Sequence, residues 1–117
     1  MSETTVLFGI KNCDSVKKAK KWLEEHNIEF TFHDFRLDGL SKDQLQEWLD
    51  KVGPDRLINK RSTTWKQLTE QDQRLASGTM ASAVVLANPT LIKRPLIESR
   101  DKITIGFTEE EYTNLFA

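Results

Sequence analysis

The period of the hydrophobic residues changes twice within the first 35 residues of the chain. Residues 4–10 are β-branched or apolar at almost every position, which predicts a strand that is covered on both faces. Apolar residues then recur at spacings of three and four and predict one amphipathic helix that ends near Asn27. Residues 28–35 alternate between apolar and polar and predict a second strand. Because a helix of this length joins parallel strands by a right-handed crossover, the chain begins as an α/β fold.

The middle of the chain is predicted to be helical. A capping box, Ser41-x-x-Gln44, opens a helix that ends at Gly53. Beyond it the pattern stays helical but broken as far as Asn88. Its helical pieces are predicted around residues 57–58, 65–68 and 80–87.

The last part of the chain returns to strands. Two short apolar runs, 96–97 and 103–105, flank the polar residues 99–102 and predict an antiparallel hairpin. A second capping box, Thr108-x-x-Glu111, opens a short terminal helix. No repeat or linker divides the 117 residues, and that length fits one domain.

Composition excludes several classes of function. Seventeen Lys and Arg against eighteen Asp and Glu leave a net charge of −1, so we expect no binding to nucleic acid or to anionic membranes. The longest apolar stretch, residues 81–87, is far shorter than the roughly 20 residues that span a bilayer. The N-terminal residues lack the features of a secretory signal, and one cysteine forms neither an internal disulfide nor a Cys-rich zinc site. His26 and His33 are too few for a metal site, so we expect no metal. Because the chain shows no secretory signal and forms no internal disulfide, we expect a cytoplasmic protein. We also expect it to be a monomer.

The single cysteine, Cys13, lies between the first predicted strand and the first predicted helix. The unpaired N–H groups and the dipole at a helix start stabilise a thiolate, which is the reactive form of cysteine, and they also bind oxyanions. Lys11 adds positive charge beside the thiol, whereas Asp14 opposes it. The alternative is that Cys13 is a small buried hydrophobic residue, although its polar loop is not an apolar stripe.

Three ordered motifs carry a resemblance to a known family. They are Gly9–Asp14, Asn59–Trp65 and Leu91–Leu96. Together they resemble the arsenate reductase–Spx (ArsC-like) family, and within it the YffB subgroup. The resemblance implies an α/β, thioredoxin-like fold with a mixed four-stranded sheet and a helical insertion at about residues 39–88, within a single domain of residues 1–117.

The resemblance also implies roles for individual residues. Cys13 matches the single nucleophilic cysteine of the family, and Arg61 and Arg94 match two arginines that bind an oxyanion and stabilise the thiolate. Pro95 matches a proline that follows a cis peptide bond. The residues predicted to bind substrate are Lys11, Asn12, Asp14, Ser15 and Pro95.

Two departures from the family pattern narrow the chemistry. Arsenate reductases carry a third arginine in the last strand, whereas residues 102–107 contain none, which weakens the case for arsenate as the substrate. Spx regulators often carry Cys-x-x-Cys, whereas Val16 stands at the second position here, so no intramolecular dithiol switch forms. A lone thiol needs an outside reductant, and the resemblance implies glutathione, with glutaredoxin as a later donor and no bound cofactor.

The resemblance supports an enzyme first: a glutathione-linked thiol oxidoreductase in which the Cys13 thiolate attacks an oxyanion or a mixed disulfide. This hypothesis predicts that the thiol ionises at a lower pH than an ordinary cysteine. The alternative is a non-enzymatic, Spx-like regulator that binds RNA polymerase and needs a docking surface instead of a reactive thiol. A third hypothesis is an inactive homologue, which keeps the fold but whose pocket binds no ligand strongly.

Overall fold

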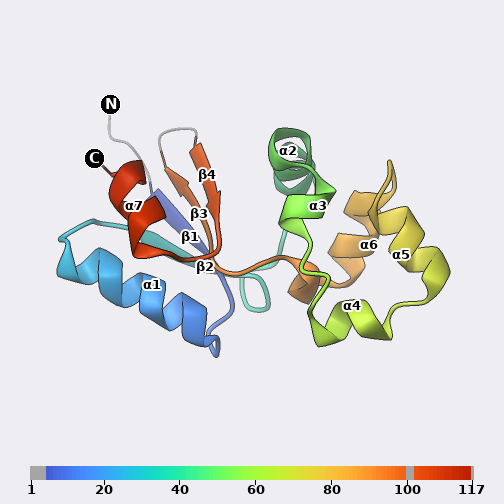
Figure 1. Ribbon diagram of the computed structural model, residues 1–117, viewed down its shortest axis with the longest axis horizontal. Coiled ribbons are helices and arrows are strands. Elements are labelled where there is room, and N and C mark those ends of the chain that lie inside the picture. The colour runs from blue at the N-terminus through green and yellow to red at the C-terminus, as the bar shows by residue number, and fades with distance from the viewer. Residues whose placement is uncertain (1–4, 100–101, 117) are drawn as a thin grey trace. The chain divides into compact units, whose positions relative to one another are not determined.

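The computed structural model describes residues 5–99 and 102–116 (Figure 1). Contacts divide the chain into two compact units. The sheet unit comprises Met1–Asp38 and Arg94–Ala117, and the helical unit comprises Gly39–Lys93. The helical segment predicted at about 39–88 lies in the helical unit. No helix in the described part of either unit is long and apolar enough to cross a membrane.

The sheet unit contains one mixed four-stranded sheet with the strand order β2-β1-β3-β4. Its strands are β1 (Thr5–Gly9), β2 (Thr31–Asp34), β3 (Leu96–Ser99) and β4 (Lys102–Ile105). Strand β1 is parallel to β2 and antiparallel to β3, and β3 is antiparallel to β4. The α/β class, the mixed four-stranded sheet and the C-terminal hairpin are therefore confirmed. Arg100 and Asp101, which we predicted in the turn of that hairpin, lie outside the described residues.

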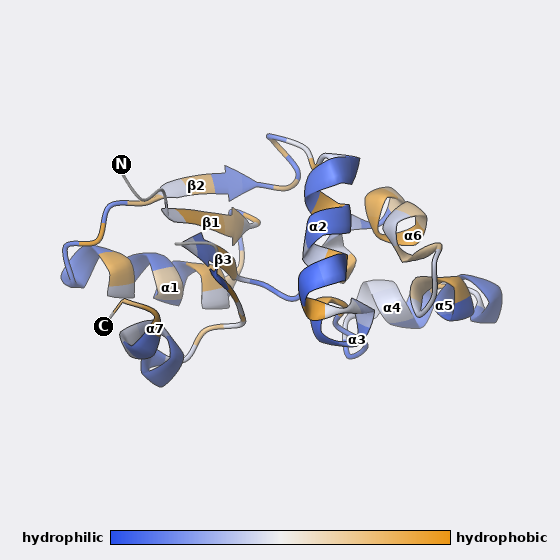
Figure 2. Cartoon of the chain, turned by 90° about the horizontal axis from the view of Figure 1, so that it is seen from above, coloured by the Kyte–Doolittle hydropathy of each residue, from blue (hydrophilic) through white to orange (hydrophobic). Residues whose placement is uncertain are grey.

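Two helices of this unit, α1 (Asp14–Glu25) and α7 (Glu109–Leu115), pack against the same buried core. Strand β1 is largely hydrophobic, whereas hydrophobic and hydrophilic residues alternate along α1 (Figure 2). The predicted apolar stripe of α1 is the buried one, and Thr108 caps α7 as predicted by accepting the Glu111 N–H. The core consists of Leu7, Val16, Ala19, Trp22, Leu23, Ile97, Tyr112 and Leu115.

Strand β2 is shorter than we predicted, because the residues before Thr31 first close helix α1. Asn27 adopts a left-handed conformation with φ of 56°. The N–H of the next residue, Ile28, donates to the Leu23 carbonyl at 2.9 Å. This is a Schellman closure with asparagine in the left-handed position, so the backbone of Ile28 satisfies the helix end.

The helical unit contains five α-helices and one 3-10 helix among its described residues. Ser41 caps the first helix as predicted, and Gly53, with φ of 82°, ends it. Ile58 and Ile92 form an isolated antiparallel bridge between two distant segments of the unit. The helices are α2 (Lys42–Val52), α3 (Pro54–Leu57), α4 (Thr63–Gln67), α5 (Glu70–Ala76), α6 (Ala81–Ala87) and η1 (Pro89–Leu91).

The sequence prediction was least accurate in this unit, where it omitted α5. Helix α5 buries a single residue, Ala76, so it has no apolar stripe that periodicity detects. The signal that identifies it is its cap, because the Thr69 side chain accepts the Asp72 N–H at 3.1 Å. The longer apolar helix predicted at 80–87 is confirmed as α6, with Met80 as its N-cap.

Candidate active site

The candidate site lies at one edge of the sheet, where the carboxyl end of β1 meets its two neighbours. Gly9 at the end of β1 is paired with Asp34 at the end of β2. On the other side Phe8 is paired with Leu96, the first residue of β3. The loop after β1 and the residues just before β3, Arg94 and Pro95, therefore belong to the same edge, which we call the carboxyl edge.

Cys13 is the N-cap of helix α1 and adopts an extended conformation, with φ of −128° and ψ of 124°. Its carbonyl accepts the Lys17 N–H at 3.0 Å, and its thiol makes no capping hydrogen bond within the described residues. The side chain is half-buried and packs against the core of the sheet unit. Cys13 is thus a partly exposed residue at a helix start, where backbone N–H groups and the helix dipole favour a negative charge.

The predicted substrate-binding residues of the same segment surround this position. Lys11 and Asn12 form an exposed turn, and Asp14 and Ser15 are exposed in the first turn of α1. All four lie next to Cys13, in the turn before it or in the first turn of α1 after it. A lysine on this junction supplies positive charge, and the first-turn N–H groups supply donors for an anion.

Gly9 allows strand β1 to end directly against helix α1. A Cβ atom at this position would lie 2.6 Å from Cγ2 of Val16, which is closer than packed carbon atoms come. Val16 is fully buried on α1. The glycine therefore sets how closely the beginning of the Cys13 loop approaches the helix.

Arg94 and Pro95 occupy the same edge from the side of β3. The peptide bond between them is cis, as the family resemblance predicted. Pro95 is buried, and its carbonyl accepts the Gly106 N–H at 2.8 Å. Arg94 is half-buried, and its Nε atom is buried.

Asp34, at the carboxyl end of β2, is a residue of this edge that sequence reasoning missed. Its side chain is buried, and its Oδ2 atom accepts the Lys11 N–H at 2.9 Å. Burial by itself raises the pKa of Asp34, but backbone N–H donors from Arg36, Lys11 and Leu37, together with the Arg36 charge, lower it below the ordinary value. The sequence shows an acidic residue near the end of the second predicted strand, but only the register of β1 and β2 places it beside the loop after β1.

Arg61 belongs to the helical unit, in a turn that its own motif builds. The Asn59 side chain accepts the Arg61 N–H at 3.0 Å, and the Asn59 carbonyl accepts the Ser62 N–H at 3.1 Å. Ser62 then caps α4 by accepting the Trp65 N–H at 3.1 Å. The Asn59–Trp65 motif is thus a local turn and helix start that leaves Arg61 exposed.

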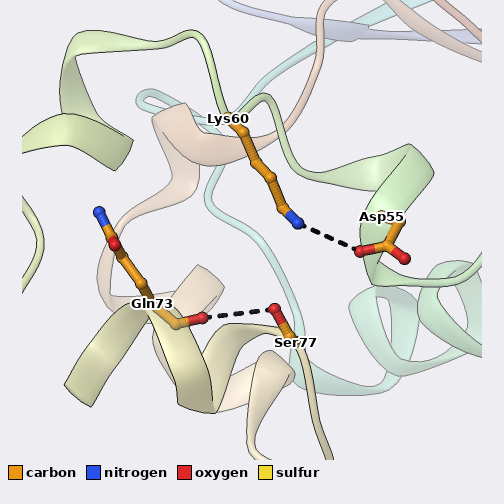
Figure 3. Close-up of polar contacts among 4 residues, drawn as sticks. All are labelled: Asp55, Lys60, Gln73 and Ser77. Atoms are coloured by element: carbon orange, nitrogen blue, oxygen red, sulfur yellow. Dashed lines mark hydrogen bonds and ion pairs between the residues drawn. The ribbon is translucent and has the colours of Figure 1, made fainter. Parts of the chain in front are cut away.

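The neighbouring Lys60 has contacts of its own within the helical unit. Its Nζ atom points toward Asp55 and lies 3.3 Å from Oδ1 (Figure 3). It also lies 5.6 Å from the ring centroid of the half-buried Trp65. A second contact drawn in Figure 3 is local too, since the Ser77 hydroxyl donates to the Gln73 carbonyl at 3.4 Å across one helical turn.

The model of the ArsC family matches residues 8–115. The chain belongs to the ArsC family. A protein of Haemophilus influenzae is 52% identical over 111 residues, covering 95% of this ArsC chain and 97% of its own length. The global transcriptional regulator Spx 1 of Oceanobacillus iheyensis is 33% identical, covering 90% and 81%.

Solved structures agree with this assignment. The structure of a protein named YFFB superposes with a TM-score of 0.88 at 36% identity and covers 97% of this ArsC-family chain and all of its own. An arsenate reductase (ArsC) related protein of Brucella melitensis superposes with a TM-score of 0.76 at 37% identity and covers 97% and 94%. Both neighbours support the mixed four-stranded α/β fold.

This ArsC-family chain has no arginine in its last strand. Strand β4 reads Lys-Ile-Thr-Ile, and the next residue, Gly106, has φ of 83° and bonds to Pro95. The arginines predicted for the site are therefore Arg94 in the sheet unit and Arg61 in the helical unit.

Proposed function

We propose that the protein is a glutathione-linked thiol oxidoreductase whose nucleophile is Cys13. The observation that carries the proposal is the position of the chain's one cysteine, half-buried and at the start of α1. Membership of the ArsC family supports the class of reaction. Arg94, half-buried on the same edge of the sheet, supports it further.

In the proposed reaction the Cys13 thiolate attacks the glutathione sulfur of a mixed disulfide. A bond forms between Cys13 and glutathione, the original disulfide bond breaks, and the substrate leaves as a thiolate that takes a proton from solvent. A second glutathione thiolate then attacks the glutathione sulfur of this adduct. Oxidised glutathione leaves and the Cys13 thiolate is restored. Overall, the mixed disulfide and one glutathione thiol become the substrate thiol and one molecule of oxidised glutathione, so one disulfide is exchanged for another.

Side-chain charge and the family resemblance support the other roles that we propose. Glutathione carries two carboxylates, and the guanidinium groups of Arg61 and Arg94 are donors suited to bind them. Lys11 adds a cation, and the first-turn N–H groups of α1 stabilise the thiolate. A mixed disulfide is preferred over arsenate because the arsenate oxyanion requires its charge to be spread over several donors, and β4 supplies no third arginine.

The first test measures the alkylation rate of Cys13 against pH. Because the chain has one cysteine, the whole signal reports this residue, and Cys13→Ser is the blank. We expect the rate to reach half its plateau well below the value of about 8.5 for an ordinary thiol. A rate that rises only above that value contradicts the proposal.

The second test measures turnover of a glutathione mixed disulfide, with and without glutaredoxin as the donor. Cys13→Ser is expected to lose roughly 1000-fold or more in kcat/KM. Arg94→Lys and Arg61→Lys, which remove the bidentate fork, are expected to lose roughly 10-fold each. Arg74→Lys, an exposed arginine of α5, is the matched control and is expected to leave turnover unchanged.

A third test follows the backbone amides by NMR while glutathione or arsenate is added. Amide shifts at residues 12–15 on adding glutathione, but not arsenate, support the substrate class.

A second candidate function rests on the Spx relatives, which are named global transcriptional regulators. In that case the protein binds RNA polymerase, and the thiol is not required. Retention of the polymerase α subunit on the immobilised protein at low salt, unchanged in Cys13→Ser, supports this function. Failure to retain the subunit at low salt removes it.

A further inference from the structure

The loop that carries Cys13 is joined to the end of strand β2 by one buried carboxylate. Asp34 is 3% exposed, and its Oδ2 atom accepts the Lys11 N–H at 2.9 Å. Its Oδ1 atom accepts the N–H groups of Arg36 at 2.7 Å and Leu37 at 3.3 Å. The carboxylate therefore connects two loops of the carboxyl edge that lie 23 residues apart in sequence.

We propose that Asp34 is a positioning residue, which holds the Lys11 N–H and thereby fixes the loop that presents the Cys13 thiol. The inference rests on the proposed function of Cys13 as the nucleophile. Asp34 acts through the backbone and is not assigned any contact with substrate.

The loop before Cys13 is short, so a single hydrogen bond to its backbone restrains it. It begins beside Gly9, where β1 touches Val16, and ends at Cys13, whose carbonyl accepts the first hydrogen bond of α1. Between these ends Lys11 and Asn12 form an exposed turn. Holding the Lys11 N–H therefore restrains the exposed part of the loop, two residues before the thiol, and nucleophilic attack is sensitive to small displacements.

Position 34 requires a carboxylate, because the three groups that bond to the side-chain oxygens of Asp34 are all N–H donors. Three N–H groups point at the two oxygens of Asp34, and an ionised carboxylate accepts all three. An asparagine offers one acceptor oxygen and an NH₂ group. One side of the site would then place a donor against a donor, and either the Lys11 bond or the Arg36 and Leu37 bonds would be lost.

Loss of charge and loss of position have opposite effects on the thiol, which makes the proposal testable. Removing a negative charge near Cys13 favours the thiolate, so by charge alone Asp34→Asn lowers the pH at which alkylation reaches half its plateau. Loosening the loop withdraws the thiolate from the helix start and raises that pH. The sign of the shift separates the two effects.

The experiment measures the pH dependence of Cys13 alkylation in Asp34→Asn and in Asp38→Asn. Asp38 is the matched control, because it is an exposed carboxylate of the same turn. Its Oδ2 accepts the Asp34 N–H at 3.0 Å, a bond that the asparagine oxygen preserves. We expect the midpoint to rise by roughly 0.5–1 pH unit in Asp34→Asn, as the helix-start stabilisation is lost, and not to rise in Asp38→Asn.

The outcomes distinguish this inference from the proposed function. A wild-type midpoint near that of an ordinary thiol overturns the role of Cys13 itself. A low wild-type midpoint that stays equal or falls further in Asp34→Asn overturns the positioning role alone. If Asp34→Asn does not fold, an acid titration of the wild type replaces it. The Lys11 and Arg36 amide resonances are then expected to shift together as Asp34 is protonated, and a Lys11 resonance that does not shift with that of Arg36 overturns the positioning role.

Discussion

The loop before α1 and the turn before α4 carry predicted site residues, but they are held in different ways. The loop that ends at Cys13 is bonded through Lys11 to Asp34, 23 residues away. The turn that carries Arg61 is bonded to Asn59, two residues away, and then continues into a helix capped by Ser62. A distant side chain therefore holds the loop of the nucleophile, whereas the side-chain bonds in the arginine's turn are local. The start of that turn is tied to a distant segment through its backbone, since the Asn59 N–H donates to the Leu91 carbonyl at 2.7 Å.

This difference indicates which substitutions are expected to disturb each loop. The side-chain bonds of Asn59 and Ser62 join near neighbours, so we expect the loss of one of them to affect the same few residues. A loop held by a distant carboxylate depends on the register of two parallel strands, so a substitution in β2 reaches the loop after β1. Substitutions that weaken each tie test the comparison.

The largest effect is expected from Asp34→Asn. At neutral pH we expect the free energy of unfolding to fall by about 2–3 kcal/mol, because the buried Asp34 side chain loses its charge and at least one of its charge-assisted hydrogen bonds. Urea unfolding measures the change, with Asp38→Asn as the control. A loss no larger than that of the control means that the long-range tie contributes little to stability.

The same pair of proteins predicts a dependence on pH. Because the folded pKa of Asp34 lies below its ordinary value of 3.8, the carboxylate stabilises the fold above that value, and the contribution is lost as the pH falls through the folded pKa. The difference in unfolding free energy between wild type and Asp34→Asn is therefore expected to stay constant from neutral pH to about 5 and to shrink below about 4. A difference that is the same at every pH contradicts this account.

Gly9→Ala is expected to cost about 1–2 kcal/mol, because the added methyl group overlaps the buried Val16. Thermal or urea unfolding measures the loss. Gly78→Ala is the matched control, since a Cβ atom there meets nothing within 4 Å. Equal stability of the two variants would show that β1 and α1 move apart without cost.

Ser62→Ala tests the local tie and is expected to cost about 1 kcal/mol, as for loss of a helix N-cap. Hydrogen exchange of the backbone amides measures how far the effect spreads. We expect faster exchange confined to residues 59–67. Ser41→Ala, which removes the cap of α2, is the comparison for a longer helix. Faster exchange of the Lys11 amide in Ser62→Ala would break the distinction between local and long-range support.

The smallest effect is expected from Asp55→Asn. The side chains of Lys60 and Asp55 are 50% and 82% exposed, so their ion pair is expected to contribute less than about 0.5 kcal/mol. Unfolding at low and high salt measures it, since an exposed pair is screened by salt. A larger, salt-independent loss would show that the turn depends on this pair as well as on Asn59.

Much of the fold was predictable because its signals are local. The caps at Ser41 and Thr108 and the stripe of α1 follow from residues three and four apart, and all three are confirmed. The cis bond before Pro95 followed from the family resemblance. Helix α5 was missed because it buries almost nothing, and the start of β2 was misplaced because Ile28 satisfies the end of α1.

The sequence by itself determined the alternation of strands and helices, the caps, and the placement of one cysteine at a helix start, because each depends on neighbours along the chain. The role of Asp34 was decided only by the tertiary structure. Its hydrogen bond to Lys11 requires β1 and β2 to lie parallel in one register, which pairs Gly9 with Asp34. Strand pairing is set by burial across the whole sheet, so no local pattern shows which distant carboxylate holds the loop.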